Sequence, residues 1–156
     1  MIKEADKKKL LVYGITLITA FVILIDFILP GKVFTEEIIN IEKERQQYYN
    51  AARNYHYSYK VVTSKHHFSV SEDFAKYVQS QKIKYSVSFI FKEVNRYGLL
   101  SSKKSSIYSF RIVSGLILPL LVIFTIVVAY KYKKRLSILI FVLQVTLLAN
   151  LIILMQ

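Results

Sequence analysis

Three runs of apolar residues divide the chain. They cover residues 10–29, 112–130 and 136–155, and Asp26 in the first run is their only charged residue. A helix of about 20 such residues is long enough to cross a hydrocarbon core about 30 Å thick. Buried helices of soluble proteins are rarely this long without a polar face. The pattern therefore predicts three transmembrane helices rather than a soluble protein with buried helices.

The first apolar run follows three lysines, as in the basic region of a secretory signal peptide. However, it is longer than the roughly 7–15 residues of a signal-peptide core, and no small-x-small cleavage site follows it. The next residues, Pro30-Gly31-Lys32, end a helix. We therefore expect residues 10–29 to be an uncleaved signal anchor.

Basic residues mark one side of the membrane at two places, the tail 1–9 and the link 131–135. Short basic flanks favour the cytoplasmic side, whereas long segments such as 31–111 cross largely regardless of charge. We therefore expect a multi-pass protein of the cell inner (cytoplasmic) membrane, with a cytoplasmic N-terminus and an extracytoplasmic segment 31–111. The residues predicted to set this topology and to contact lipid headgroups are Lys7, Lys8, Lys9, Lys131, Lys133, Lys134 and Arg135.

The extracytoplasmic segment begins with a pattern typical of an amphipathic helix over residues 35–52. Thr35 is a suitable N-cap, and Glu36 and Glu37 follow it where the helix dipole favours acids. Apolar residues then recur at three-, four- or seven-residue spacing along one stripe. This stripe has three potential partners, namely a sheet of the same domain, the lipid surface or another protein. We expect the first.

A period of two replaces the helical period after this segment. Alternating polar and apolar residues, many of them aromatic or β-branched, predict half-buried strands. The elements expected are strands at 55–62, 66–70, 83–91 and 107–113, a brief helix capped by Ser71 and ending near Val78, a turn at 95–98 and a polar loop at 99–106. The complete fold is thus predicted to be an integral membrane α-helical protein with a small extracytoplasmic α+β domain. That domain is expected to contain an antiparallel sheet of three to four strands.

Polar residues inside the apolar runs are the candidate contacts between helices or with partners. Asp26 lies near the extracytoplasmic end of its run, where it can meet the interface or pair with a neighbouring cation. An ion relay would need further ionisable groups at membrane depth. Gln144, Thr146 and Asn150 can hydrogen-bond to helices of this chain or of another membrane subunit. Pro119 predicts a kink in the second helix.

Residues typical of catalytic or metal sites are sparse. The absence of cysteine excludes a disulfide framework, a thiolate metal site and a cysteine nucleophile. The three histidines, His56, His66 and His67, lack the spacing of a metal site, and the sequence has no phosphate-binding loop, nucleophile elbow or EF-hand loop. We therefore expect no enzyme activity, no metal and no cofactor.

The net charge of +12 is concentrated in segment 31–111, which holds 14 basic and 7 acidic residues. Such a segment attracts anionic lipid, an acidic polysaccharide or an acidic protein. An extracytoplasmic domain seldom meets nucleic acid. The expected partners are therefore membrane lipid and a larger membrane protein complex, without nucleic acid.

These features favour one functional hypothesis over two others. The favoured one is a non-enzymatic accessory or scaffold subunit of a cell-envelope membrane protein complex, which docks through its transmembrane helices and its basic external domain. The first alternative is a stand-alone membrane binding, sensor or immunity protein. The second is a small membrane enzyme acting on lipid or polysaccharide.

Overall fold

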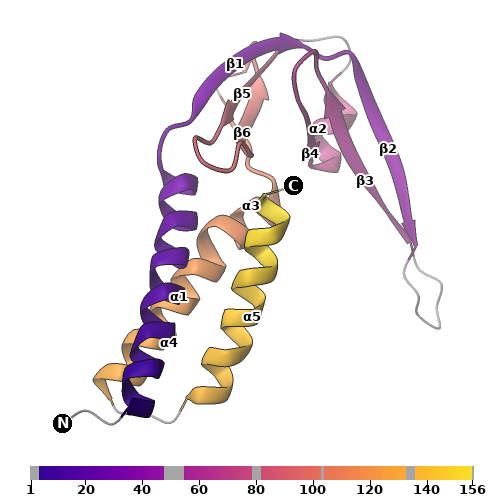
Figure 1. The fold of residues 1–156 in the computed structure, drawn as a ribbon. Helices are drawn as coiled ribbons and strands as arrows, with labels where there is room; N and C mark the ends of the chain where they lie inside the picture. The colour runs from indigo at the N-terminus through magenta and orange to yellow at the C-terminus, as the bar shows by residue number, and fades with distance from the viewer. Residues whose placement is uncertain (1–3, 48–54, 79–81, 103, 133–135, 156) are drawn as a thin grey trace. The chain divides into compact units, whose positions relative to one another are not determined.

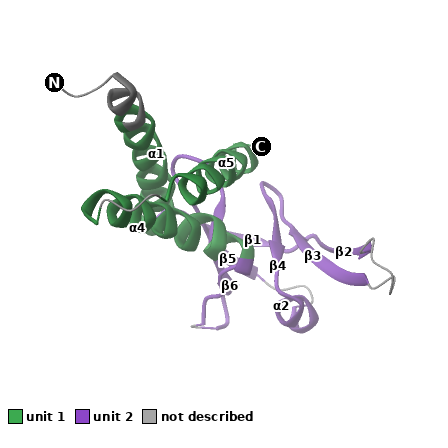
Figure 2. Ribbon diagram, turned by 90° about the horizontal axis from the view of Figure 1, so that it is seen from below, with its two compact units in different colours: residues 1–29, 110–156 green, residues 30–109 purple. Residues whose placement is uncertain are grey.

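The computed structural model describes residues 4–47, 55–78, 82–102, 104–132 and 136–155, with side chains from Leu10 onward. The chain forms two compact units, which Figure 2 distinguishes by colour. The helical unit consists of Met1–Leu29 and Phe110–Gln156, and the inserted unit, Pro30–Ser109, is the stretch of chain between its two parts. Each unit has a packed interior of its own.

The helical unit contains three helices that are long and apolar enough to cross a membrane. The first is α1 (Glu4–Ile28), the second combines α3 (Ser109–Ile112), a π-helical segment (Val113–Ile117) and α4 (Leu118–Lys131), and the third is α5 (Ser137–Leu154). Figure 1 shows α1, α4 and α5 packed together. Their apolar stretches are only 22%, 39% and 22% buried within the chain. Most of this apolar surface therefore faces outward, which is the pattern of helices that contact lipid or a partner.

The second long helix widens just before Pro119. Residues Val113–Ile117 are π-helical, and Pro119 lies in the first turn of α4. Proline has no backbone N–H. It therefore costs little stability in the first turn of a helix, where the regular α-helical hydrogen bonds begin again. The structure thus shows a π-helical segment leading into the proline, and the kink expected at Pro119 stays a prediction.

The described residues of the inserted unit form two antiparallel sheets of three strands each. The first has the order β1 (Lys32–Glu37), β5 (Lys82–Val87) and β6 (Val94–Leu99). The second has the order β2 (Asn40–Gln47), β3 (Tyr55–Val62) and β4 (His67–Val70), and α2 (Glu72–Tyr77) follows β4. The expected sheet of three to four strands is divided into two because β1 pairs with β5 while β2 pairs with β3.

The two sheets share one hydrophobic core. Phe34 of β1 lies opposite Tyr85 of β5, and Val61 of β3 lies opposite Phe68 of β4. The rings of Phe68 and Tyr85 have centroids 5.0 Å apart and join the two sheets. Each fully buried large apolar side chain contributes roughly 1.5–3 kcal/mol to folding. The buried core residues are Tyr59, Val61, Val70, Ala75, Ile83, Tyr85, Val87 and Tyr97.

Three secondary-structure predictions are wrong. The helix expected over 35–52 is instead β1 and β2, because pairing with β5 and β3 packs Phe34 and Ile41 against the core; residues 48–52 lie outside the described residues. The strand expected at 107–113 is helical from Ser109, since its apolar residues also continue the second long helix. The turn expected at 95–98 is part of β6.

Other predictions are confirmed. The strands expected at 55–62 and 66–70 are β3 and β4, and the strand expected at 83–91 is confirmed as β5 only as far as Val87. The brief helix is α2, and the Ser71 hydroxyl accepts a hydrogen bond from the Phe74 N–H at 3.4 Å. Local capping chemistry was sufficient to place this helix.

Candidate functional site

A buried ion pair joins the helix that leads into the inserted unit to the helix that follows it. Arg111 Nη2 donates to Asp26 Oδ2 at 3.2 Å. Asp26 is 2% exposed and Arg111 is 4% exposed, and the guanidinium carbon lies 5.6 Å from the ring centroid of Phe27. Of the two environments expected for Asp26, the structure thus shows pairing with a cation. The pair fastens two helices at positions 85 residues apart.

Two other polar side chains of the apolar runs also bond across helices of this chain. Gln144 Nε2 donates to Thr16 Oγ1 on α1 at 3.0 Å. Asn150 Nδ2 donates to the backbone carbonyl of Ser114, in the π-helical segment, at 3.0 Å. Thr146, in contrast, donates to the carbonyl of Val142 one turn earlier in its own helix. Docking of these residues on a partner subunit stays a prediction.

The basic residues predicted to set the topology are described only in part. Lys131, at the end of α4, places its Nζ 5.7 Å from the ring centroid of Tyr132. Lys7, Lys8 and Lys9 belong to α1, but their side chains are outside the described set. Lys133, Lys134 and Arg135 lie outside the described residues.

Sequence reasoning did not identify Thr16, Arg111 and Ser114. The charge of Arg111 interrupts the apolar pattern, so the sequence analysis assigns it to the end of the external segment. A signal was nevertheless available, because Arg111 directly precedes the second run and Asp26 lies near the matching end of the first run. Thr16 and Ser114 carry no such signal, since short hydroxyl side chains commonly bond to their own helix.

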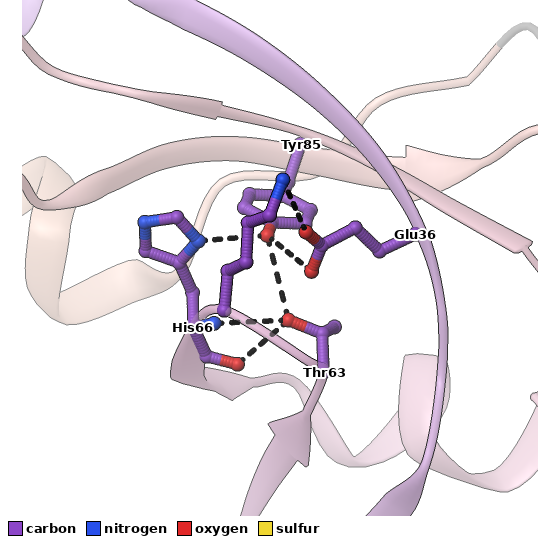
Figure 3. A network of polar contacts seen from close by, with 5 residues as sticks. Glu36, Thr63, His66 and Tyr85 are labelled. Carbon is purple, nitrogen blue, oxygen red and sulfur yellow. Dashed lines mark hydrogen bonds and ion pairs between the residues drawn. The ribbon is translucent and has the colours of Figure 1, made fainter.

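A second polar cluster lies in the inserted unit (Figure 3). The Tyr85 hydroxyl donates to Glu36 Oε2 at 2.9 Å, and its oxygen is 2.8 Å from His66 Nδ1 and 3.4 Å from Thr63 Oγ1. Thr63 Oγ1 also donates to the carbonyl of His66 and accepts from its N–H. These side chains come from β1, β5 and the β3–β4 connection, so the cluster ties the two sheets together.

This environment shifts two pKa values. Burial raises the pKa of Tyr85 to about 12, and the neighbouring Glu36 carboxylate adds to the shift. Burial also acts to raise the pKa of Glu36, but the nearby Thr63 hydroxyl, hydrogen bonds from Tyr85 and the Lys65 N–H, and the Lys65 charge outweigh it and lower the pKa from 4.5. Near neutral pH, a protonated phenol therefore donates to an ionised carboxylate, an arrangement that suits a structural role.

One face of the β2–β3 hairpin combines cations with aromatic rings. In the register, Lys43 lies opposite Tyr59 and Arg45 lies opposite Tyr57. Lys43 Nζ is 3.9 Å from the ring centroid of Tyr57, and the guanidinium carbon of Arg45 is 4.1 Å from that of Tyr55. The outer rings, Tyr55 and Tyr57, are 50% and 38% exposed. We call the surface formed by Lys43, Arg45, Tyr55 and Tyr57 the hairpin face.

The opposite side of the same hairpin is acidic on β2. Opposed residues of a strand pair share a side of the sheet, so Glu42 and Glu44 lie with Lys60 and Ser58, away from Lys43. Lys60 Nζ is 3.1 Å from Glu44 Oε1. Strand β2 therefore carries its cations on one side and its carboxylates on the other, where Lys60 of β3 pairs with Glu44.

Metal ligands do not gather in the part of the chain that the structure describes, where no group of three or more His, Asp or Glu side chains could hold an ion. His66 belongs to the core cluster of Tyr85. Comparisons with protein-family models, with curated proteins and with solved structures find no match for this chain. The assignment of a function therefore depends on the geometry of the chain itself.

Proposed function

We propose that this chain is a non-enzymatic accessory or scaffold protein of the cell inner (cytoplasmic) membrane that binds an acidic partner protein through its hairpin face. The outward apolar surface of α1, α4 and α5 supports insertion into a membrane. The basic tail 1–9 and link 131–135 support a cytoplasmic N-terminus. In this orientation the inserted unit is extracytoplasmic.

The hairpin face is the observation that carries the proposal. Among the described residues, neither Lys43 nor Arg45 forms a salt bridge, although both belong to a strand that also carries two carboxylates. Stacking on tyrosines holds both cations in place while their outer N–H groups stay accessible. A preordered cation loses less side-chain entropy when it binds a carboxylate. Tyrosine and arginine are also enriched at protein–protein interfaces.

The long helices contribute fewer polar contacts to a partner than the sequence suggests. Gln144 and Asn150 bond to α1 and to the π-helical segment, and Asp26 pairs with Arg111. Their hydrogen-bonding capacity is thus used within the helical unit. The proposal therefore assigns the specific contact with the partner to the inserted unit and leaves apolar contacts to the helices.

A second copy of the chain is a poor occupant of the β2 edge. β2 lies at the edge of its sheet, and opposed residues of two paired strands must share a side. Antiparallel pairing of β2 with itself, centred on Lys43, would place Lys43 opposite Lys43 and Glu42 opposite Glu44. Centred on Glu44, the pairing would place Lys43 opposite Arg45 and Glu44 opposite Glu44. Like charges directly opposite each other are destabilising, so the arrangement favours a different, acidic chain.

The alternative functions make different predictions. A stand-alone binding, sensor or immunity protein would purify without a stoichiometric partner. A membrane enzyme would lose activity on substitution of an essential acid, and Asp26 is the one acid within the apolar runs. Because Asp26 is buried in an ion pair, its substitution would change folding as well as chemistry. Surface variants of the hairpin face give a cleaner test.

The experiment is purification of the tagged full chain from native membranes in mild detergent, with identification of co-eluting proteins. Lys43→Ala/Arg45→Ala is compared with Lys60→Ala/Lys82→Ala, which removes two exposed lysines from the same unit. We expect a stoichiometric partner that is lost from the first variant and retained by the control.

Retention of the partner by both variants would exclude the hairpin face as the docking surface. A wild-type chain that elutes alone would exclude the subunit proposal and favour the stand-alone alternative. Because the contact is between charges, we also expect the partner to dissociate as ionic strength rises.

A further inference from the structure

The outer face of the β1–β5–β6 sheet is hollowed into a groove of about 450 Å³. The groove exists because the chain after β6 folds back over the sheet: the Tyr97 N–H donates to the Ser106 carbonyl at 2.9 Å, and the Ser106 N–H donates to the Tyr97 carbonyl at 2.7 Å. Gly98 permits this return, since a Cβ at that position would lie 2.6 Å from the carbonyl oxygen of Lys104. The described lining residues are Val33, Lys84, Tyr85, Ser86, Arg96, Tyr97, Gly98, Leu99, Leu100, Ser102, Lys104 and Ser105.

The groove is positively charged and rich in hydrogen-bond donors. Lys84, Arg96 and Lys104 line it, and no carboxylate belongs to its described lining. Among the described residues, none of these three cations forms a salt bridge. Three serines, Ser86, Ser102 and Ser105, add hydroxyl groups. Charge complementarity therefore selects an anion with several oxygen acceptors.

The groove also presents apolar side chains beside its cations. Val33 is 54% exposed and Leu100 is 55% exposed. A soluble anion would gain nothing from these two side chains, whereas an amphiphile would bury apolar surface against them. The lining thus favours an anionic group attached to an apolar body.

The chain tethers this groove to the ends of two long helices. Val33 follows Leu29, the last residue of the first apolar run, by four residues, and Lys104 precedes Ser109, where α3 begins, by five. An extended chain spans at most about 3.6 Å per residue, so these lining residues stay within about 14 Å and 18 Å of the two helix ends whatever the orientation of the unit. If the helices cross a membrane, as proposed above, the groove is held within reach of the headgroup layer.

We infer that this groove binds the headgroup of an anionic phospholipid. Lys84, Arg96 and Lys104 contact the phosphate and the serines contact the polar headgroup, while Val33 and Leu100 contact the apolar part next to it. This inference rests on the proposed membrane insertion but not on the hairpin face, which is formed by other residues. The site would hold the inserted unit on the bilayer surface.

The test is native mass spectrometry of the full chain, purified in neutral detergent and titrated with phosphatidylglycerol or phosphatidylcholine. The groove variant is Lys84→Ala/Arg96→Ala/Lys104→Ala. The control, Lys43→Ala/Arg45→Ala/Lys60→Ala, removes the same charge from the hairpin. We expect the wild-type chain and the control to retain one phosphatidylglycerol in preference to phosphatidylcholine. In the groove variant, retention should fall at least about tenfold.

A second variant tests the shape of the groove without changing its charge. Gly98→Ala forces the Lys104 backbone away from the sheet, so we expect the preference for phosphatidylglycerol to fall while net charge is unchanged. The side chains of Lys84, Arg96 and Lys104 are exposed, so their loss should leave the fold intact. Circular dichroism of each variant shows whether the sheets are retained.

Three outcomes would overturn the inference. Equal retention by the groove variant and the wild type would show that the lipid binds elsewhere, and equal loss in groove variant and control would show charge attraction without a site. Binding of soluble polygalacturonate, but not of phosphatidylglycerol, in a manner that needs Lys84, Arg96 and Lys104 would reassign the groove to an acidic polysaccharide. None of these results affects the partner test of the hairpin face, so the two proposals can fail separately.

Discussion

The helical unit and the inserted unit each contain an ion pair of nearly the same length. Arg111 Nη2 and Asp26 Oδ2 are 3.2 Å apart, and Lys60 Nζ and Glu44 Oε1 are 3.1 Å apart. The side chains of the first pair are 4% and 0% exposed, and those of the second are 37% and 48% exposed. Water and salt screen the exposed pair far more than the buried one. The contribution of each ion pair to stability therefore depends on its burial rather than on the distance between its charges.

The same contrast extends to each unit as a whole. In the helical unit, Phe124 and Ile138 are 69% and 83% exposed while Asn150 is 6% exposed, whereas in the inserted unit Val61 and Ile83 are fully buried. Apolar burial therefore organises the inserted unit. In the helical unit, close packing and a few polar contacts between helices decide which faces meet.

Substitution of Asp26 is expected to have the largest effect on stability. Asp26→Ala leaves the Arg111 guanidinium buried without its carboxylate, and breaking a buried pair in this way costs about 3–5 kcal/mol. We expect the free energy of unfolding of the full chain in neutral detergent to fall by that amount, measured by thermal unfolding with circular dichroism.

The double variant Asp26→Leu/Arg111→Met is the control. It removes both charges and leaves apolar side chains of similar size, a change that is often neutral in other proteins. We expect it to recover most of the lost stability. A double variant as unstable as Asp26→Ala would show that attraction between the charges, rather than an isolated buried charge, accounts for the loss.

The close approach of Gly115 to α1 gives the next largest effect. A Cβ at this position would lie 2.5 Å from Cδ2 and 3.0 Å from Cβ of Phe27, so Gly115→Ala must displace the Phe27 side chain or the helix that carries it. Overpacking of this kind costs about 1–3 kcal/mol. Gly14→Ala is the matched control, because nothing lies within 4 Å of a Cβ there. The same thermal unfolding measurement should show Gly14→Ala as neutral or stabilising, and equal losses would contradict the close packing at Gly115.

The local patterns were sufficient to predict part of this fold. The apolar runs form long helices, the segment capped by Ser71 forms α2, and the alternating segment 55–62 forms β3. Each of these patterns depends only on residues that are close in the sequence. Glu36 shows where this reasoning fails. Beside Thr35 it is typical of a helix N-terminus, yet its carboxylate bonds to Tyr85, 49 residues away. Long-range strand pairing therefore overrode the local signal.

The candidate sites were predictable only in part, for the same reason. Gln144 and Asn150 stand out in an apolar run, but their partners are 128 and 36 residues away. Gln144 bonds to a threonine hydroxyl and Asn150 bonds to a backbone carbonyl, and neither group is recognisable as a partner from the sequence. The hairpin face was not predictable because residues 35–52 were expected to form a helix, whereas this face depends on the pairing of β2 with β3. The groove was hidden because it depends on the return of the chain across β6 at Gly98.

Loss of the Tyr85 hydroxyl is expected to have an effect on the inserted unit that is smaller than that of Asp26→Ala and comparable to that of Gly115→Ala. Tyr85→Phe removes the donor to Glu36 and the contact with His66, and leaving buried polar groups unpaired costs about 1–3 kcal/mol. Unfolding of the full chain by urea, followed by near-ultraviolet circular dichroism of its tyrosines, measures this loss. Thr63→Ser keeps the hydroxyl of the cluster and should cost less.

The polar cluster of Glu36 and Tyr85 is expected to make the stability of the inserted unit depend on pH. The folded pKa of Glu36 is lowered from 4.5, so its contribution is present above pH 4.5 and is lost as the pH falls through the folded pKa. The folded pKa of Tyr85 is raised from 10.0 to about 12, so its contribution is present below pH 10 and is lost as the pH rises toward 12. Glu36→Gln should flatten the acid limb, and Tyr85→Phe the alkaline limb. Unchanged limbs would show that other groups control both transitions.

Substitution of Glu44 is expected to have the smallest effect, although its ion pair is as short as that of Asp26. Glu44→Gln keeps the side-chain shape and leaves Lys60 solvated, and exposed pairs contribute only about 0.2–1 kcal/mol. At about 1 M salt, where the Debye length is about 3 Å, this small loss should vanish, whereas the loss in Asp26→Ala should persist because salt does not reach a buried pair. The two variants, measured by thermal unfolding at low and high salt, therefore separate burial from distance. If both variants lost equal stability with equal sensitivity to salt, water would reach the Asp26 pair. The ion pair between the two helices would then be an exposed contact like that of the hairpin.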